Sequence, residues 1–206
     1  MKRISKKKKE LHEIINKSRN LIKILLIILI VMALGVALLI INNTKILFNN
    51  VNKVEREKIN TTINEYMVKR CEEENSDPYT KCLSSNKIYL VEKIIDSDLS
   101  LEKAYKGYEF YYYAYSWILE GSYGKKDNEI EEISGSSIPT KVMLGKKGDT
   151  YTVIKTDIPR DGSYYSEDLN KLFPSKVRKK MNNAQVDGTV MKLLEENKKK
   201  AEEYFK

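Results

Sequence analysis

The feature that most constrains this chain is an uninterrupted apolar run over residues 24–41. Its eighteen residues are Ile, Leu, Val, Met, Ala and one Gly, with no charged or polar side chain among them. As a helix the run is about 27 Å long, close to the roughly 30 Å hydrocarbon core of a bilayer. Helices of soluble domains normally carry a polar face. The run therefore predicts a transmembrane helix, with a buried helix of a soluble core as the alternative.

The positive charge of the chain is concentrated before this run. Residues 1–23 contain nine Lys or Arg and two Glu, a net charge of +7 out of +8 for the whole chain. The near-neutral remainder argues against a nucleic-acid-binding domain, which would carry a basic face. Excess Lys and Arg mark the cytoplasmic flank of a span. Residues 1–23 are thus predicted to be a cytoplasmic tail, and residues 42–206 to lie outside the cell membrane.

A cleaved signal peptide is the alternative to this anchor. Its apolar region is shorter, usually about 7 to 15 residues, and it ends at a small-residue cleavage site. The residues that follow the run, Asn42, Asn43, Thr44 and Lys45, offer no such site. An uncleaved anchor that contacts the lipid bilayer is therefore the favoured interpretation.

The remaining residues predict one α+β domain, an antiparallel sheet packed by helices. Residues 42–74 are expected to form a stalk and a first helix, because apolar residues recur at helical spacing: Leu47, Val51, Val54, Ile59, Ile63 and Met67. Residues 75–206 form the rest of the extracytoplasmic domain. Strands are predicted at 87–95, 108–119 and 129–134, with a polar turn at 121–128 and a hairpin of 140–144 with 150–156.

Residues 108–119 are predicted to be a central strand with one face under a helix. Phe110, Tyr112, Ala114 and Ile118 would share one face, and Tyr111, Tyr113, Tyr115 and Trp117 the other. The aromatic row has a second interpretation, as a surface for a carbohydrate or a peptide. After the sheet, a helix is expected to start with Ser166 as its N-cap and to bend or restart at Pro174. A last amphipathic helix ends the chain.

Cys71 and Cys82 bracket the turn around Pro78. Outside the cell two such cysteines can form a disulfide that closes a small loop. The alternative is two free thiols, one on a helix and one in a loop. Two cysteines without histidine ligands do not make a zinc site, so no metal and no cofactor is predicted.

Three segments have a pattern that extends beyond secondary structure: residues 134–140 (Ser-Gly-Ser-Ser-Ile-Pro-Thr), 159–165 (Pro-Arg-Asp-Gly-Ser-Tyr-Tyr) and 171–174 (Lys-Leu-Phe-Pro). With the hairpin between them, they resemble a C-terminal extracytoplasmic module of Firmicutes membrane proteins. Some of those proteins are metallopeptidases of the β-lactam-sensing antirepressor type. The peptidase part has no counterpart here, because the sequence contains no His-Glu-x-x-His. The resemblance therefore implies a module on its own anchor, without protease activity.

The candidate binding residues lie in two of these segments: Ser134, Ser136, Asp161, Ser163 and Tyr164. A structural role is the alternative, since Gly135 and Gly162 permit unusual backbone angles and Asp161 can bond the backbone two residues on. Catalysis is not predicted. The only histidine, His12, precedes the apolar run, which excludes His-based triads and Cys-His dyads from the domain.

The sequence predicts a single-pass membrane protein of a low-GC bacterium whose extracytoplasmic domain binds or senses an envelope protein or peptide. The Lys-, Ile- and Asn-rich composition favours the low-GC source. The alternative is an assembly scaffold similar to the NTF2-like inner-membrane factors of secretion and conjugation systems. A scaffold would self-associate as a homo-oligomer, which distinguishes the two hypotheses.

Overall fold

The structure is a computed structural model, and it describes Arg19, Lys23 and residues 27–36, 51–94, 107–184 and 186–206. The chain divides into two compact units, Met1–Phe48 and Asn49–Lys206. Residues 27–36 of the first unit are helical. Within the described ranges, no helix is both long and apolar enough to cross a membrane. Residues 24–26 and 37–41 of the expected span lie outside those ranges.

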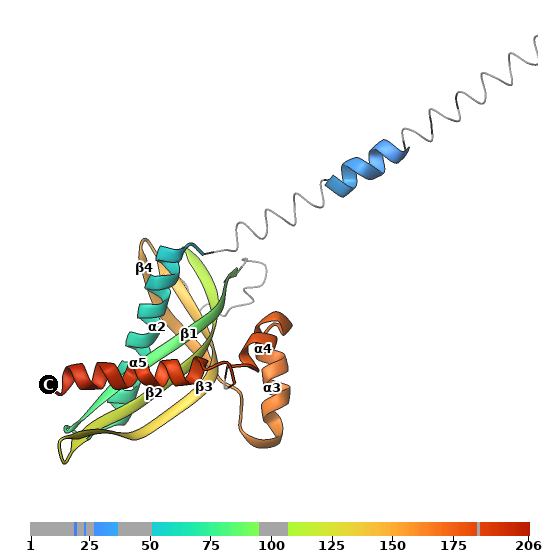
Figure 1. The fold of residues 1–206 in the computed structure, drawn as a ribbon. Helices are drawn as coiled ribbons and strands as arrows, with labels where there is room; N and C mark the ends of the chain where they lie inside the picture. The colour runs from blue at the N-terminus through green and yellow to red at the C-terminus, as the bar shows by residue number, and fades with distance from the viewer. Residues whose placement is uncertain (1–18, 20–22, 24–26, 37–50, 95–106, 185) are drawn as a thin grey trace, which may run out of the picture. The chain divides into compact units, whose positions relative to one another are not determined.

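The second unit is an α+β domain with one antiparallel sheet, as predicted (Figure 1). Its elements are α2 (Lys53–Glu74), β1 (Thr80–Ile94), β2 (Phe110–Lys126), β3 (Glu129–Lys147), β4 (Thr150–Asp157), the 3-10 helix η3 (Gly162–Tyr164), α3 (Tyr165–Leu172), α4 (Ser175–Met181) and α5 (Thr189–Tyr204). The strands form a meander in the order β1-β2-β3-β4, so each strand pairs with its neighbour in the sequence.

Helix α2 starts at Lys53, within the predicted stalk and first helix of residues 42–74. Asn52 caps it, with a side-chain oxygen that accepts a 2.9 Å hydrogen bond from the backbone N–H of Glu55. Residues 44–50 lie outside the described part of the chain, and Asn52 has an extended backbone. The helix ends at Glu74, shortly before Pro78.

The buried residues of α2 are Ile59, Ile63 and Met67, spaced one turn apart. They enter the core on one face of the sheet. The folded unit therefore includes α2, which the sequence placed together with the stalk in residues 42–74. Packing against the sheet decides this, because the other side chains of α2 are mostly polar or exposed and would not stabilise the helix alone.

The hairpin of β2 and β3 is longer than predicted. The expected polar turn over residues 121–128 is wrong, because β2 continues to Lys126. Only Asp127 and Asn128 form the turn, and both have positive φ, 49° and 66°. This is the left-handed geometry of a two-residue hairpin connection, which Asn and Asp adopt more readily than most residues.

The segment of residues 134–140 also belongs to a strand. The expected short strand over 129–134 continues through it as β3. Gly121 and Gly135 lie directly opposite each other in the ladder. A Cβ on Gly121 would lie 2.7 Å from the backbone oxygen of Ser134, so glycine permits the close approach of the two strands here.

Pro139 is tolerated in β3 because it lies beyond the end of β4. The last residue pair between the two strands joins Lys141 to Asp157. Before Lys141, β3 pairs only with β2. We call residues 129–139 the open β3 edge. A proline without an N–H costs no ladder hydrogen bond on such an edge.

Both faces of β2 are buried. Tyr112, Ala114 and Ile118 face α2, together with buried residues of the other strands: Ile88, Val91, Val142, Leu144 and Tyr151. Tyr115 and Trp117 pack on the opposite face against the C-terminal helices, through Phe173, Val177, Met181, Ala184 and Leu193. The alternation confirms the predicted faces. The helical cover on the second face was not predicted from the sequence, which assigned a helix to one face only.

The helix after the sheet restarts at Pro174, as predicted, and gives α3 and α4. The prediction that Ser166 is its N-cap is wrong. The helix follows η3 directly, so Tyr164 occupies the cap position and Ser166 lies inside α3. The physical reason is the tight corner at Gly162, where η3 starts helical turns before Ser166.

Candidate functional site

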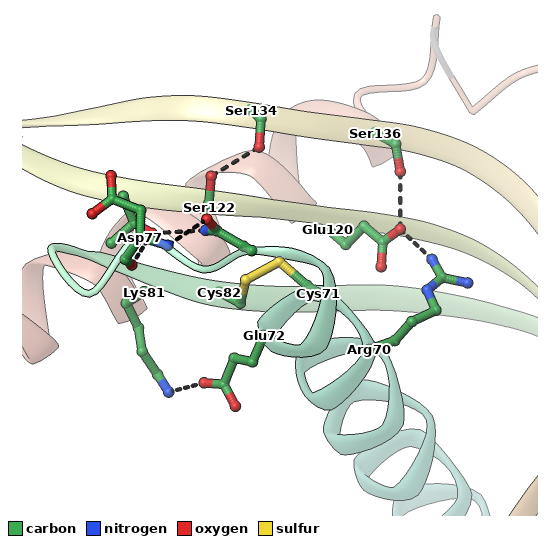
Figure 2. Close-up of a disulfide and its surroundings, with 12 residues drawn as sticks. Arg70, Cys71, Glu72, Asp77, Lys81, Cys82, Glu120, Ser122, Ser134 and Ser136 are labelled. Atoms are coloured by element: carbon green, nitrogen blue, oxygen red, sulfur yellow. Dashed lines mark hydrogen bonds and ion pairs between the residues drawn. A yellow bond between two sulfur atoms is a disulfide. The ribbon is translucent and has the colours of Figure 1, made fainter.

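The disulfide joins the last turn of α2 to β1. Cys71 and Cys82 are bonded with an S–S distance of 1.98 Å and a Cα–Cα distance of 5.9 Å. Cys82 is buried. Figure 2 shows the bond between the two elements, with a group of polar side chains on the neighbouring strands. The structure thus contains the expected disulfide rather than two free thiols.

Ser134 and Ser136 belong to this polar group, on the α2 face of the sheet. Ser134 shares a 2.8 Å hydrogen bond with Ser122 on β2. Ser136 donates a 3.3 Å hydrogen bond to the carboxylate of Glu120. The same carboxylate oxygen accepts a bond from the guanidinium of Arg70 on α2 (Figure 2). Both serines are therefore held by neighbouring strand side chains, and the charge of Glu120 is compensated by Arg70.

Asp161, Ser163 and Tyr164 lie elsewhere, at the corner between β4 and α3. All three are exposed. The structure does not bring them together with Ser134 and Ser136 in one site. Gly162 has φ +71°, so this corner requires the positive φ that glycine permits.

The predicted turn bond of Asp161 is wrong, because its side chain caps no backbone N–H of the following helix. Asp168 provides the bond instead. Its carboxylate accepts from the backbone N–H of Arg160 at 3.0 Å and from its Nε and Nη2 at 2.7 and 2.8 Å. These bonds hold the pKa of Asp168 well below its ordinary value. Arg160 and Asp168 are eight residues apart, and only the folded corner brings them into a bidentate pair. No local sequence pattern therefore predicts this pair.

Replacing Gly162 by Ala is expected to destabilise the domain by about 1 to 2 kcal/mol, the cost of a left-handed residue with a Cβ. No atom lies within 4 Å of the added Cβ, so the cost comes from the backbone alone. Gly162→Asn should recover part of the loss, because Asn tolerates this conformation. Asp161→Ala is the control, with no expected change beyond about 0.5 kcal/mol. Urea denaturation measures all three, and an equal loss in the control would contradict a backbone origin.

The Arg160–Asp168 pair also predicts a pH dependence. The pKa of Asp168 is lower in the folded state. The pair therefore contributes its full stabilisation of the folded state above the unfolded pKa of about 3.9. This stabilisation is lost as the pH falls through the folded pKa. We expect Asp168→Asn to lower the urea midpoint at pH 7 and to flatten its decline below about pH 4. Glu167→Gln, which removes an exposed pair with Lys171, should keep the wild-type profile. The same flattening in both variants would contradict the assignment.

The segments 134–140 and 159–165 do approach each other around Trp117. The indole Nε1 donates a 2.9 Å hydrogen bond to Ser137. Tyr165 borders a cavity of about 210 Å³ beside the same indole, whose lining is Trp117, Tyr165, Leu169, Arg178, Met181 and Asn182. Residues 134–140 and 159–165 therefore share a structural role, because both help to join the sheet to α3 and α4.

Two charged clusters hold elements together. Glu55 accepts from Lys146 at 2.6 Å and from Tyr151 at 3.0 Å, which fastens the start of α2 to β3 and β4. The hydrogen bond from Lys146 lowers the pKa of Glu55, and burial raises the pKa of Tyr151 to about 12. Lys200 on α5 donates to the Ser85 hydroxyl at 2.7 Å, and burial lowers the pKa of this lysine.

The Lys200–Ser85 contact has the residue types of a Ser-Lys catalytic dyad. Ser85 is only 1% exposed, in the middle of β1. Lys200 also donates to the backbone oxygen of Ser84 at 2.7 Å. A nucleophile must reach its substrate, so this arrangement is suited to fastening α5 to β1. No group of three or more His, Cys, Asp or Glu within the described ranges is arranged to hold a metal ion.

A basic groove along β1 was not predicted from the sequence. We define the β1 groove by Arg56 on α2, Lys87 on β1, Lys180 on α4, and Asp187 and Lys192 around the start of α5. Its volume is about 620 Å³. The four cations come from four different elements. No spacing along the chain connects them, because only the packing of α2, α4 and α5 around β1 brings them to one surface.

Comparison with known proteins gives no further identification: no protein-family model, no curated protein and no solved structure matches this chain.

Proposed function

We propose that this chain is a single-pass membrane protein of a low-GC bacterium, with a non-catalytic domain that binds or senses a component outside the cell membrane. The Cys71–Cys82 disulfide carries the proposal. Structural disulfides persist in oxidising surroundings and are rare in the cytosol. The apolar run of residues 24–41 and the +7 tail before it supply the anchor and its direction.

The environment of the polar groups in the described part of the domain supports the non-catalytic assignment. Ser85 is buried under Lys200, and Glu120 is compensated by Arg70. The shape of the domain supports binding instead, since exposed side chains of four elements converge on the β1 groove. Purified full-length protein should therefore turn over no peptide, ester or peptidoglycan substrate.

The topology is tested with cells whose wall has been removed. Added protease should digest residues 49–206 and spare an epitope on residues 1–23. Thiol labelling of unreduced, denatured protein should leave Cys71 and Cys82 unmodified. Protection of the domain until the membrane is opened would reject the proposal, and labelling of both cysteines would reject the oxidising location.

The open β3 edge favours assembly as a second candidate function. Residues 131–137 are exposed and have no strand partner on the side away from β2 among the described residues. An unpaired strand edge is a template for pairing with another chain. If the protein is a scaffold, it should form homo-oligomers in neutral detergent, and Ile133→Lys should dissociate them. A monomer in both cases would exclude this function.

A further inference from the structure

The β1 groove is one end of a longer depression that crosses an edge strand of the sheet. A second hollow of about 340 Å³ adjoins it and is lined by Lys53, Arg56, Glu57, Asn60, Asn86, Lys87 and Ile88. The two hollows share Arg56, Lys87 and Ile88. Together they cross the edge of the sheet at residues 86–89 of β1, from α2 on one face to the start of α5 on the other, so the surface is suited to an elongated ligand.

The charge of this surface is local. Residues 49–206 carry 27 Lys or Arg and 27 Asp or Glu, so the folded unit is neutral as a whole. The four cations of the groove are exposed. None of them has a carboxylate at salt-bridge distance among the described residues. A neutral unit with four cations in one concavity, none of them in a salt bridge, presents a binding surface for an anion.

The one carboxylate among the described residues of the β1 groove is already engaged, and the adjoining hollow contains a second, Glu57. Asp187 accepts a 2.9 Å hydrogen bond from the backbone N–H of Thr189, at the first residue of α5. Hydrogen bonds from Thr189 and the nearby charges of Lys192 and Lys87 lower the pKa of Asp187. The positive end of the α5 dipole also lies at this point, which favours negative charge.

The backbone of β1 is less available than its side chains. Arg56 donates through Nη2 to the carbonyl oxygen of Ile88 at 2.9 Å, and Lys200 donates to that of Ser84 at 2.7 Å. These bonds occupy backbone acceptors of the edge strand. A ligand therefore meets ammonium groups along the groove, and the pairing of an added peptide strand is hindered.

We propose that the β1 groove binds a linear polyanion that carries phosphate groups along its length. The adjoining hollows account for a linear ligand, and the lysine ammonium groups beside a helix N-terminus account for phosphate. This inference deepens the proposed function by naming the ligand class of the domain. Binding by the purified protein does not depend on which side of the membrane the domain lies. The protease experiment, which tests topology, and the binding experiment can therefore fail separately.

The test uses full-length protein in a detergent with neutral headgroups and fluorescent polyphosphate as the probe. Every sample carries four substitutions to Gln in the basic tail, at Lys6, Lys7, Lys8 and Lys9. They reduce the binding of polyphosphate by the tail. Lys87→Gln/Lys192→Gln removes two cations from the groove. Lys125→Gln/Lys126→Gln is the matched control, because it removes two exposed lysines at the β2–β3 turn.

We expect the groove variant to bind polyphosphate at least about tenfold more weakly and to reduce the salt-dependence slope by about 2, one for each lysine that no longer neutralises a phosphate. The control should keep the affinity and the slope. Equal weakening in the two variants, or none in the groove variant, would overturn the proposal.

Competitors identify the source of the anion. Inorganic phosphate should compete only at much higher concentration, because it engages few of the cations at once. Polyglutamate that competes as well as polyphosphate would overturn the preference for phosphate. If monomeric short-chain phosphatidylglycerol competes as well as polyphosphate, the groove binds a lipid headgroup, and the proposal of a polymeric ligand is rejected.

Discussion

Loss of the Cys71–Cys82 bond is expected to lower the free energy of unfolding by about 3 kcal/mol, because the bond closes a loop and reduces the entropy of the unfolded chain. The two cysteines are 11 residues apart. The bond cross-links α2 to β1 (Figure 2). Its loss should therefore also raise amide exchange in the last turn of α2. Urea denaturation of Cys71→Ser/Cys82→Ser beside the wild type measures the change.

Reductant provides the internal control for this prediction. Wild-type protein in reductant should lose most of the stability that the double variant loses, and the double variant should not respond to reductant. Equal midpoints for wild type and variant would mean that the bond is absent from the purified protein or closes no constrained loop.

Ile63→Ala is expected to destabilise the domain by about 3 to 4 kcal/mol, the usual cost of emptying a buried branched side chain. Ile63 is 0% exposed, between Ile59 and Met67 on the face of α2 that enters the sheet. The loss combines the transfer of the side chain to water with the cavity that remains. The same urea experiment measures it, with a lower midpoint and an unchanged slope.

Val54→Ala is the matched control on the same helix. Val54 is 66% exposed, so its truncation should change stability by no more than about 0.5 kcal/mol in either direction. Comparable losses at both positions would contradict a packing origin, because Ala has a higher helix propensity than Ile or Val and propensity alone predicts no loss. A small loss at Ile63 would contradict the assignment of α2 to the folded unit.

The candidate site was predictable only in part. The sequence marked Ser134, Ser136 and Asp161, and the corner at Gly162 does require glycine. The serines and the corner lie apart, because a strand sends alternate side chains to opposite faces and the corner lies after β4. Asp168 was missed, since its bond with Arg160 spans a 3-10 turn and part of α3. The β1 groove was also missed.

The sequence by itself determined the properties that depend on short periods and on composition. These are the apolar run of residues 24–41, the two apolar faces of β2 and the interruption of the helix at Pro174, and it made a Cys71–Cys82 disulfide one of two options that the structure then decided. Each of them follows from residues that are close in the chain, where local geometry limits the choices.

Only the tertiary structure decided which long-range neighbours meet. The lengths of β2 and β3 depend on cross-strand pairing through Gly121 and Gly135. Such pairing can override the preference of a polar, glycine-containing stretch for a turn. The helical cover of the second sheet face and the convergence of Arg56, Lys87, Lys180 and Lys192 depend on how α2, α4 and α5 pack around β1. The burial of apolar surface drives that packing and is non-directional, so the periodicity of one helix does not specify the neighbours of its polar side chains.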